Sequence, residues 1–272
     1  MKRSRFLIGL FLLLPFCAVA QDHYSNWFEV DVNKELGKQW DLNAGAELRT
    51  NDKARYSFSL GAEYKPVKFL KLGLGYTFIE REGTTEDHYT ANGIWDGFNR
   101  TSSWVRNHRG TFDVTGSVKL WKWLRVSLRE RYQFTYRPEQ TVEQRKVRYD
   151  VYDLGGGQYD VDMDNPDISD RDDKVKDALY NHVLRSRLKL EIDKKKWRFA
   201  PFIAGELHNN LTNNMLIEKV RAMAGTEYKF DKHHSISAAY VLNIDLHDAD
   251  AASFDDINER LHAFNLSYCY KF

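Results

Sequence analysis

Cysteine is scarce in this 272-residue sequence, and long apolar runs are missing beyond its N-terminal end. The two cysteines are Cys17 and Cys269. Removal of an N-terminal signal peptide would leave Cys269 alone, so neither a disulfide framework nor a cysteine metal site is possible. A membrane-spanning helix needs about 20 predominantly apolar residues, and no segment after residue 20 provides them. These absences exclude a disulfide-stabilised fold and a helical membrane protein.

The N-terminus has the features of a cleavable secretory signal peptide. Three basic residues and an apolar run over residues 6–16 precede the tripeptide Ala18-Val19-Ala20, which provides an A-x-A cleavage site. A lipoprotein site at Cys17 is the alternative, but the bulky Phe16 argues against it. We therefore predict a signal peptide over residues 1–20.

The mature chain, residues 21–272, is close to electrical neutrality. The signal peptide takes three of the 40 Lys and Arg residues and none of the 39 Asp and Glu residues, leaving 37 against 39. The basic footprint of a nucleic-acid-binding protein is absent, so we expect no such partner. Mean hydropathy is polar at −0.61, yet 14% of the residues are aromatic. This combination is expected for a β-barrel whose strands are apolar on one face only.

Segments in which apolar and polar residues alternate follow one another along the mature chain. In residues 70–78, for example, Leu, Tyr and Phe at even positions alternate with Lys, Gly and Thr at odd positions. A period of two predicts strands with one apolar face, and no helical period competes with it. Eleven such segments span residues 24–35, 40–50, 54–64, 70–82, 108–120, 124–136, 180–192, 197–209, 216–230, 234–245 and 260–272.

The number of segments conflicts with the even strand number that is normal for single-chain bacterial barrels. Either ten strands close the wall and 24–35 is a plug, or one strand is missed and twelve close it. Twelve is slightly favoured. Parity stays open at this point.

The connections between the segments are strongly asymmetric in length. A soluble β-sandwich would also alternate, but its connections would be of similar length at both ends. Five connections here are tight turns, whereas three are long and polar, near residues 83–107, 137–179 and 246–259. Short periplasmic turns and long extracellular loops are typical of outer-membrane barrels. We therefore predict an all-β, transmembrane antiparallel barrel of about 10–12 strands, exported across the inner membrane into outer-membrane lipid.

Several segments of the mature chain have a recognisable order and spacing: Trp27 with the hairpin that follows it to Glu47-Leu48-Arg49, the segments 70–76, 128–133 and 184–192, the strand Pro201–Leu207 and the terminal segment 265–272. In these segments the chain resembles a Bacteroidota family of outer-membrane β-barrel proteins of unknown function. The resemblance covers most of the mature chain. It implies the fold and the location, and it implies no activity, cofactor or catalytic residue.

The chain ends on Phe272, which is preceded at every second position by Tyr270, Tyr268 and Leu266. This pattern looks like the C-terminal signal that the barrel-assembly machinery reads during insertion. An ordinary last strand is the alternative, and both interpretations are compatible.

Charged residues recur on the face of the strands that would line the barrel interior. Opposite charges could pair and hold a narrow lumen shut, which we favour because a buried charge needs a partner. Alternatively, the arginines could line an anion-preferring passage. Glu130 would face lipid by strict alternation, and a β-bulge near Arg129 would redirect it. The predicted lumen-lining residues are Glu47, Arg49, Glu63, Arg125, Arg129, Arg131, Arg185, Arg187, Glu206, Arg221 and Glu227.

Enzyme chemistry and metal binding have weak support in the sequence. His208, beside Asn209 and Asn210, is the only suggestive group for a lipase-type site, and no catalytic motif accompanies it. Acidic residues over 160–173 invite a calcium interpretation, but the glycine and the glutamate of an EF-hand loop are missing. We expect a non-enzymatic barrel without a metal or cofactor, either a narrow channel or a structural or surface-recognition protein. An outer-membrane lipid-modifying enzyme is the alternative.

Overall fold

A computed structural model of the chain describes residues 23–50, 54–83, 85–101, 103–194, 197–246 and 258–272. The predicted signal peptide lies outside the described residues. All regular structure in the described part is β-strand. None of its segments is a helix long and apolar enough to cross a membrane.

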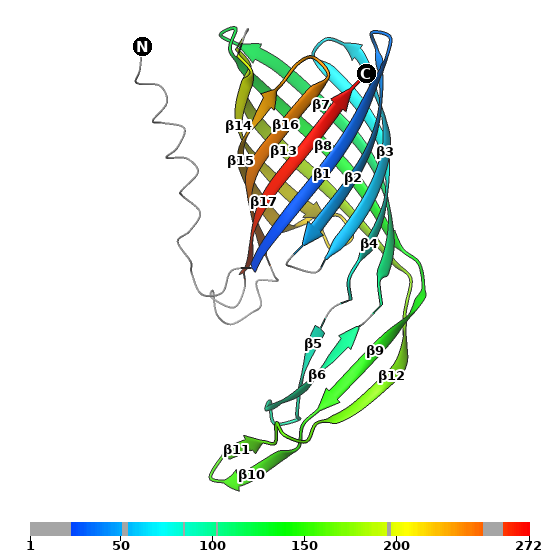
Figure 1. The fold of residues 1–272 in the computed structure, drawn as a ribbon, viewed down its shortest axis with the longest axis vertical. Coiled ribbons are helices and arrows are strands. Elements are labelled where there is room, and N and C mark those ends of the chain that lie inside the picture. Colours follow the sequence, from blue (N-terminus) through cyan, green and yellow to red (C-terminus); the bar gives the residue numbers. More distant parts are fainter. Residues whose placement is uncertain (1–22, 51–53, 84, 102, 195–196, 247–257) are drawn as a thin grey trace.

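Eleven strands form a closed barrel, and neighbours around the wall follow chain order (Figure 1). Each alternating segment of the sequence becomes one of these strands. They are β1 (His23–Leu36), β2 (Trp40–Thr50), β3 (Arg55–Val67), β4 (Leu70–Arg81), β7 (Val105–Leu120), β8 (Leu124–Arg137), β13 (Leu179–Ile192), β14 (Phe199–Asn210), β15 (Leu216–Lys229), β16 (His234–Leu246) and β17 (Asn258–Lys271).

The strand number is therefore odd, and the expectation of twelve strands was wrong. β1 belongs to the wall and is not a plug, because it pairs with β2 on one side and with β17 on the other. In an up-and-down barrel an odd count leaves the first and last strands pointing the same way. β1 and β17 accordingly pair in parallel, with His23 opposite Leu261 and Asn33 opposite Lys271. Parallel strands still exchange evenly spaced hydrogen bonds, so the wall closes without a free edge.

The two ends of the barrel differ in their connections. At the short-turn end, defined by residues 37–39, 68–69, 121–123, 193–194 with 197–198, and 230–233, the connections between strands are short. At one of these turns, the three-residue connection 121–123, Trp121 and Lys122 both have positive φ, 48° and 61°, as the two central residues of a type I′ turn require. The opposite end, the long-loop end, carries the connections near 83–107, 137–179 and 246–259 and the start of β1.

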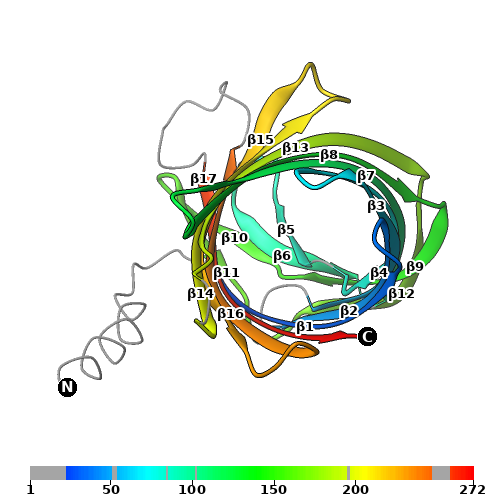
Figure 2. The ribbon, with the colours of Figure 1, turned by 90° about the horizontal axis from the view of Figure 1, so that it is seen from above.

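Two of the long connections form an additional sheet beyond the long-loop end (Figure 1). We call β5 (Thr85–Tyr89), β6 (Trp95–Thr101), β9 (Gln140–Arg148) and β12 (Asp167–Lys176) the extension sheet, whose order is β12-β9-β6-β5. A hairpin of β10 (Val151–Gly155) and β11 (Gln158–Val161) follows β9, and Gly155–Gly157 turn it with positive φ. β5 and β6 lie beyond the end of the barrel (Figure 1), and in the view along the barrel they fall within the outline of the ring of strands (Figure 2).

The two faces of the barrel wall differ in chemistry. The outward face carries large apolar side chains, and Phe58, Leu60 and Leu74 are 60–66% exposed. Glu130 also lies on this face, where it accepts a hydrogen bond from Ser186 Oγ at 2.6 Å. β8 keeps an unbroken register with both neighbours, so the expected β-bulge near Arg129 is wrong. A polar partner on the next strand, and not a bulge, accommodates this carboxylate.

Candidate functional site: a charged cavity inside the barrel

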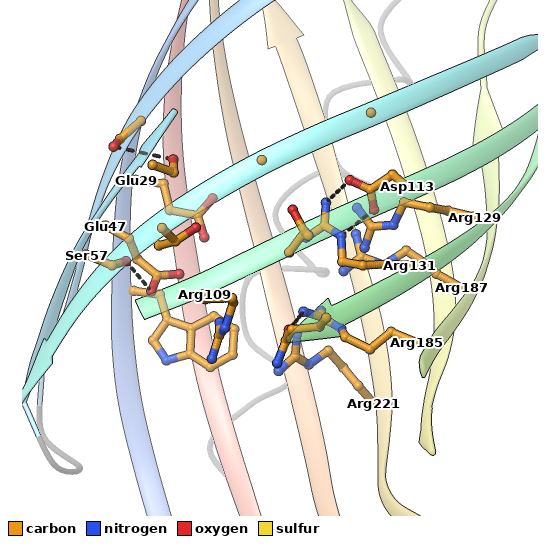
Figure 3. A pocket seen from close by; sticks show the side chains of 18 of the residues that line it. Glu29, Glu47, Ser57, Arg109, Asp113, Arg129, Arg131, Arg185, Arg187 and Arg221 are labelled. Carbon is orange, nitrogen blue, oxygen red and sulfur yellow. Dashed lines mark hydrogen bonds and ion pairs between the residues drawn. The ribbon is translucent and has the colours of Figure 1, made fainter. Parts of the chain in front are cut away.

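A cavity of about 820 Å³ lies inside the barrel, and all eleven barrel strands contribute to its lining. The lining extends from Lys219, near the long-loop end, to Glu63 and Ser237, near the short-turn end. The alternation of the strands explains this composition, because every second side chain points inward. Figure 3 shows the charged groups around the cavity.

Glu206 on β14 is the centre of the densest charge cluster. Its side chain is completely buried, and it lies behind the arginines that line the cavity. Arg185 Nη2 contacts Oε1 at 2.6 Å, and Arg187 Nε contacts Oε2 at 2.5 Å. Arg129 Nη2 and Arg221 Nη1 approach at 3.1 Å and 3.5 Å. His208 Nε2 lies 2.8 Å from Oε1. Four guanidinium groups therefore surround one carboxylate.

Two more arginines lie near this cluster. Arg131 on β8 makes a two-pronged ion pair with Asp113 on β7, with Nη2 2.9 Å from Oδ2. Arg109 on β7 donates from Nε to Thr135 Oγ1 at 3.4 Å. No carboxylate in the described part of the chain lies within ion-pair distance of Arg109. We call these six residues the arginine wall: Arg109, Arg129, Arg131, Arg185, Arg187 and Arg221.

The opposite side of the cavity, formed by β1 and β2, carries further carboxylates, among them Glu29 and Glu47 (Figure 3). Glu47 binds Arg49 Nη2 at 2.8 Å and Arg55 Nη2 at 2.7 Å. Glu29 accepts a hydrogen bond from Asn265 Nδ2 at 2.9 Å, and Asp31 lies beyond it on β1. Within the described residues, neither Glu29 nor Asp31 has an ion-pair partner. The cavity therefore separates a side rich in guanidinium groups from a side with unpaired carboxylates.

Trp27 packs against the charged groups of the same region. Its ring lies 3.8 Å from the Arg49 guanidinium carbon and 5.4 Å from that of Arg221. The indole N–H donates to Ser25 Oγ at 3.0 Å, which donates to the Thr50 carbonyl. The buried indole thus satisfies its one donor, and its faces stack on cations, an arrangement that stabilises desolvated guanidinium groups.

Eight of the residues predicted to line the lumen do line the cavity: Glu47, Arg49, Glu63, Arg129, Arg131, Arg185, Arg187 and Arg221. Glu206 lies behind them. Arg125 is instead at the short-turn end, where its Nη2 is 2.6 Å from Asp193 Oδ2. Hydrogen bonding from Lys119, helped by the charge of Arg125, lowers the pKa of Asp193. Glu227 lies outside the lining, 4.0 Å from Lys229 Nζ.

Sequence reasoning also missed several groups of the site. Glu29, Asp31, Arg55, Arg109 and Asp113 all line the cavity. Their signal was available, since each occupies an inward position of its strand. The pairing was less accessible: of Arg125, Arg129 and Arg131, only Arg129 contacts a glutamate from the predicted lumen-lining set.

The remaining candidate groups lie apart from one another. His208, the group considered for a lipase-type site, is buried beside Glu206. In the acidic segment, Asp160 is on β11 and Asp167 and Asp173 are on β12. Among the described residues, no three His, Cys, Asp or Glu side chains are arranged to hold a metal ion.

The C-terminal residues of the predicted assembly signal lie on the outward face at the short-turn end. Phe272 donates its backbone N–H to the Asn33 carbonyl at 2.8 Å, and its ring meets Tyr270 edge-on at 4.7 Å. Tyr268 binds His234 Nδ1 at 2.7 Å, and Leu266 is exposed. The terminal segment therefore joins the wall beside β1.

Comparison with curated proteins finds none that matches the chain. A family described as "Protein of unknown function (DUF2490)" matches residues 24–253. The match begins at the start of β1 and extends beyond β16, so it covers ten of the eleven barrel strands and the extension sheet. This chain therefore belongs to the DUF2490 family, whose function is unknown.

Proposed function

We propose that this protein is an integral outer-membrane β-barrel that provides a narrow polar passage for small hydrophilic solutes. The observation that carries the proposal is the combination of a closed wall, an apolar outer face and a polar cavity that all eleven strands line. A barrel built in this way is apolar where lipid would contact it and polar where water would fill it.

Membrane insertion is supported by the distribution of exposed apolar side chains. Every barrel strand carries at least one large hydrophobic residue that is exposed, for example Val30, Phe112 and Ile203. Soluble monomers rarely expose contiguous apolar patches of more than a few hundred Å². A closed barrel also pairs its backbone groups between strands, which the membrane interior demands.

Aromatic groups near both ends of the barrel support the same placement. Trp40 packs on Tyr64, and Phe199 on Tyr228, at the short-turn end. Tyr136 stacks on Tyr180 at the long-loop end. Trp and Tyr are enriched at membrane–water interfaces, where an amphipathic ring meets both phases. We infer that these rings mark the two interfaces, that the short turns are periplasmic and that the extension sheet is extracellular.

A closed structural or recognition barrel is the second candidate, because ion pairs occupy much of the interior. The enzymatic alternative has less support. A lipid-modifying site needs a nucleophile beside a base at the lipid interface, whereas His208 is directed at Glu206 inside the wall. We therefore infer a non-enzymatic role.

Single-channel recording tests the passage directly. The mature chain, refolded and inserted into planar bilayers, should give discrete, small conductance steps, and heat-unfolded protein should give none. Thr111→Trp should reduce the step size, since Thr111 lines the cavity. Gly110→Trp is the matched control, because an added side chain there meets open space on the outward face. A folded barrel without conductance would favour the closed alternative.

Export and processing are tested separately. N-terminal sequencing of the membrane form should begin at Gln21, following cleavage after Ala20. A chain that starts at Met1, or at a lipidated Cys17, would contradict this part of the proposal.

A further inference from the structure

We propose that the arginine wall is a binding site for the oxyanion group, phosphate or carboxylate, of a small hydrophilic solute. The inference rests on the proposed function, because solutes must be able to enter the cavity. It goes further by naming the chemical class of solute that binds there. It arises from an imbalance of charge that the protein's own groups do not remove.

The arginine wall carries more positive charge than the carboxylates in contact with it can neutralise. Asp113 neutralises Arg131. Glu206 carries one negative charge and faces four guanidinium groups, those of Arg129, Arg185, Arg187 and Arg221. Arg109 has no carboxylate partner in the described chain. Guanidinium groups do not lose their protons in proteins, so about four positive charges of the arginine wall have no carboxylate in contact with them.

A charged group that is buried away from water needs a partner of opposite charge, and the side chains of the arginine wall are mostly buried. The side chains of Arg185 and Arg221 are each only 11% exposed, and that of Arg129 is 20% exposed. Arg129 Nε is buried without any hydrogen-bond acceptor. An anion entering the cavity would compensate this charge, and its attraction is strengthened because the surroundings screen poorly.

The donor geometry is available for an oxyanion. Arg187 reaches Glu206 through Nε, and Arg109 reaches Thr135 through Nε. Their terminal amino groups have no other partner among the described residues, and both residues line the cavity. A guanidinium group offers paired donors that match a phosphate or carboxylate. Figure 3 shows the arginines directed toward the cavity from strands β7, β8, β13 and β15.

The opposite side restricts the rest of the ligand. Glu29 and Asp31 on β1 lack ion-pair partners in the described chain and repel a second anionic group. They accept hydrogen bonds from hydroxyl or amino groups. A cavity of about 820 Å³ is in the size range of small-molecule sites. The expected solute has an oxyanion at one end and hydrogen-bond donors at the other, as in a sugar phosphate or a hydroxylated or amino acid.

Thermal unfolding of the folded, detergent-solubilised mature chain tests the site without requiring conduction. Inorganic phosphate, gluconate and glucose 6-phosphate are titrated at constant ionic strength, with sodium chloride as the reference. At least one of the three should raise the melting temperature saturably above the chloride reference. Glucose 6-phosphate against gluconate, which carries a single carboxylate, separates the two oxyanion classes. Equal melting temperatures in all four solutions would overturn the proposal.

Variants locate the binding. Arg109→Gln leaves no carboxylate unpaired, so the barrel should fold, and it should weaken binding about tenfold, the effect of losing one charge-assisted contact. Arg198→Gln removes the same charge from an exposed turn and should change nothing. The Glu206→Gln variant should melt at a lower temperature than the unsubstituted chain in chloride. Addition of the binding anion should raise its melting temperature by more than it raises that of the unsubstituted chain. Unchanged affinity in Arg109→Gln would overturn the site.

The binding and passage results are separable. Saturable stabilisation without conductance steps would retain the anion site and contradict the passage. Conductance without any anion-specific stabilisation would retain the passage and contradict the site.

Discussion

Arg185 Nη2 lies 2.6 Å from Oε1 of Glu206, and the carboxylate has no exposure to solvent. The pair joins neighbouring strands, β13 and β14, and Arg129 and Arg221 extend the same contact to β8 and β15. A single carboxylate thereby holds together cations from three strands around its own. Glu206 should therefore contribute more to the stability of the barrel than any one of these arginines.

Glu206→Gln should therefore destabilise the barrel much more than Arg129→Gln. Loss of the carboxylate leaves four guanidinium groups without a counterion, and removal of one partner from a buried ion pair costs about 3–5 kcal/mol. Loss of Arg129 leaves Glu206 with three cations and relieves repulsion among them, so the change should stay within about 1 kcal/mol. Urea unfolding of the two variants in lipid vesicles measures both. Equal losses of stability in Glu206→Gln and Arg129→Gln would contradict this prediction and indicate that Glu206 and Arg129 form a simple one-to-one ion pair.

Gly225→Ala should destabilise the wall where β15 meets β16. A Cβ at Gly225 would lie 2.5 Å from the Ala238 carbonyl oxygen and 2.6 Å from the Ala239 Cβ. Such overpacking costs about 1–3 kcal/mol, because backbone atoms must move. Gly205→Ala on β14 is the matched control, since its Cβ meets nothing within 4 Å. Equal melting temperatures for both variants would contradict the close approach of these strands.

Deletion of Phe272 should lower the amount of folded, heat-modifiable protein in the membrane. The insertion machinery is expected to read the terminal aromatic residue, and the deletion also removes the hydrogen bond to Asn33. Phe264→Ala is the control, because Phe264 lies on the same face of β17 and is similarly exposed, 47% against 53%. Equal losses for the two variants would reduce the C-terminal segment to an ordinary strand.

The odd strand number predicts that the two ends of the mature chain lie on opposite sides of the membrane. In a Cys269→Ser background, His23→Cys and Asn213→Cys should react with a membrane-impermeant maleimide on intact cells. Lys122→Cys, at the short-turn end, should react only after the outer membrane is permeabilised. With an even number of wall strands, ten or twelve, His23 would lie on the same side of the membrane as Lys122. Joint protection of these two residues would therefore contradict parallel closure by β1 and β17.

The alternation of side chains was sufficient to predict the strands themselves. A period of two is a local property, since successive residues of an extended chain point to opposite faces whatever lies beside them. Residues 54–64 and 70–82 became β3 and β4 with shifts of at most a few residues. The inward direction of Arg129, Arg131 and Arg185 followed from the same pattern. The hairpin with three glycines was also foreseeable, because glycine adopts positive φ without steric cost.

Closure and charge pairing were decided by the tertiary structure. Whether β1 joins β17 depends on strands separated by more than 200 residues, and the local alternation of side chains does not specify which strands become neighbours. The same holds for Arg131, which meets Asp113 and not a glutamate, and for the four arginines that share Glu206. Alternation specifies which face a side chain occupies. The register between strands and the closed curvature of the wall determine which charge lies opposite it, and therefore where positive charge is left without a partner.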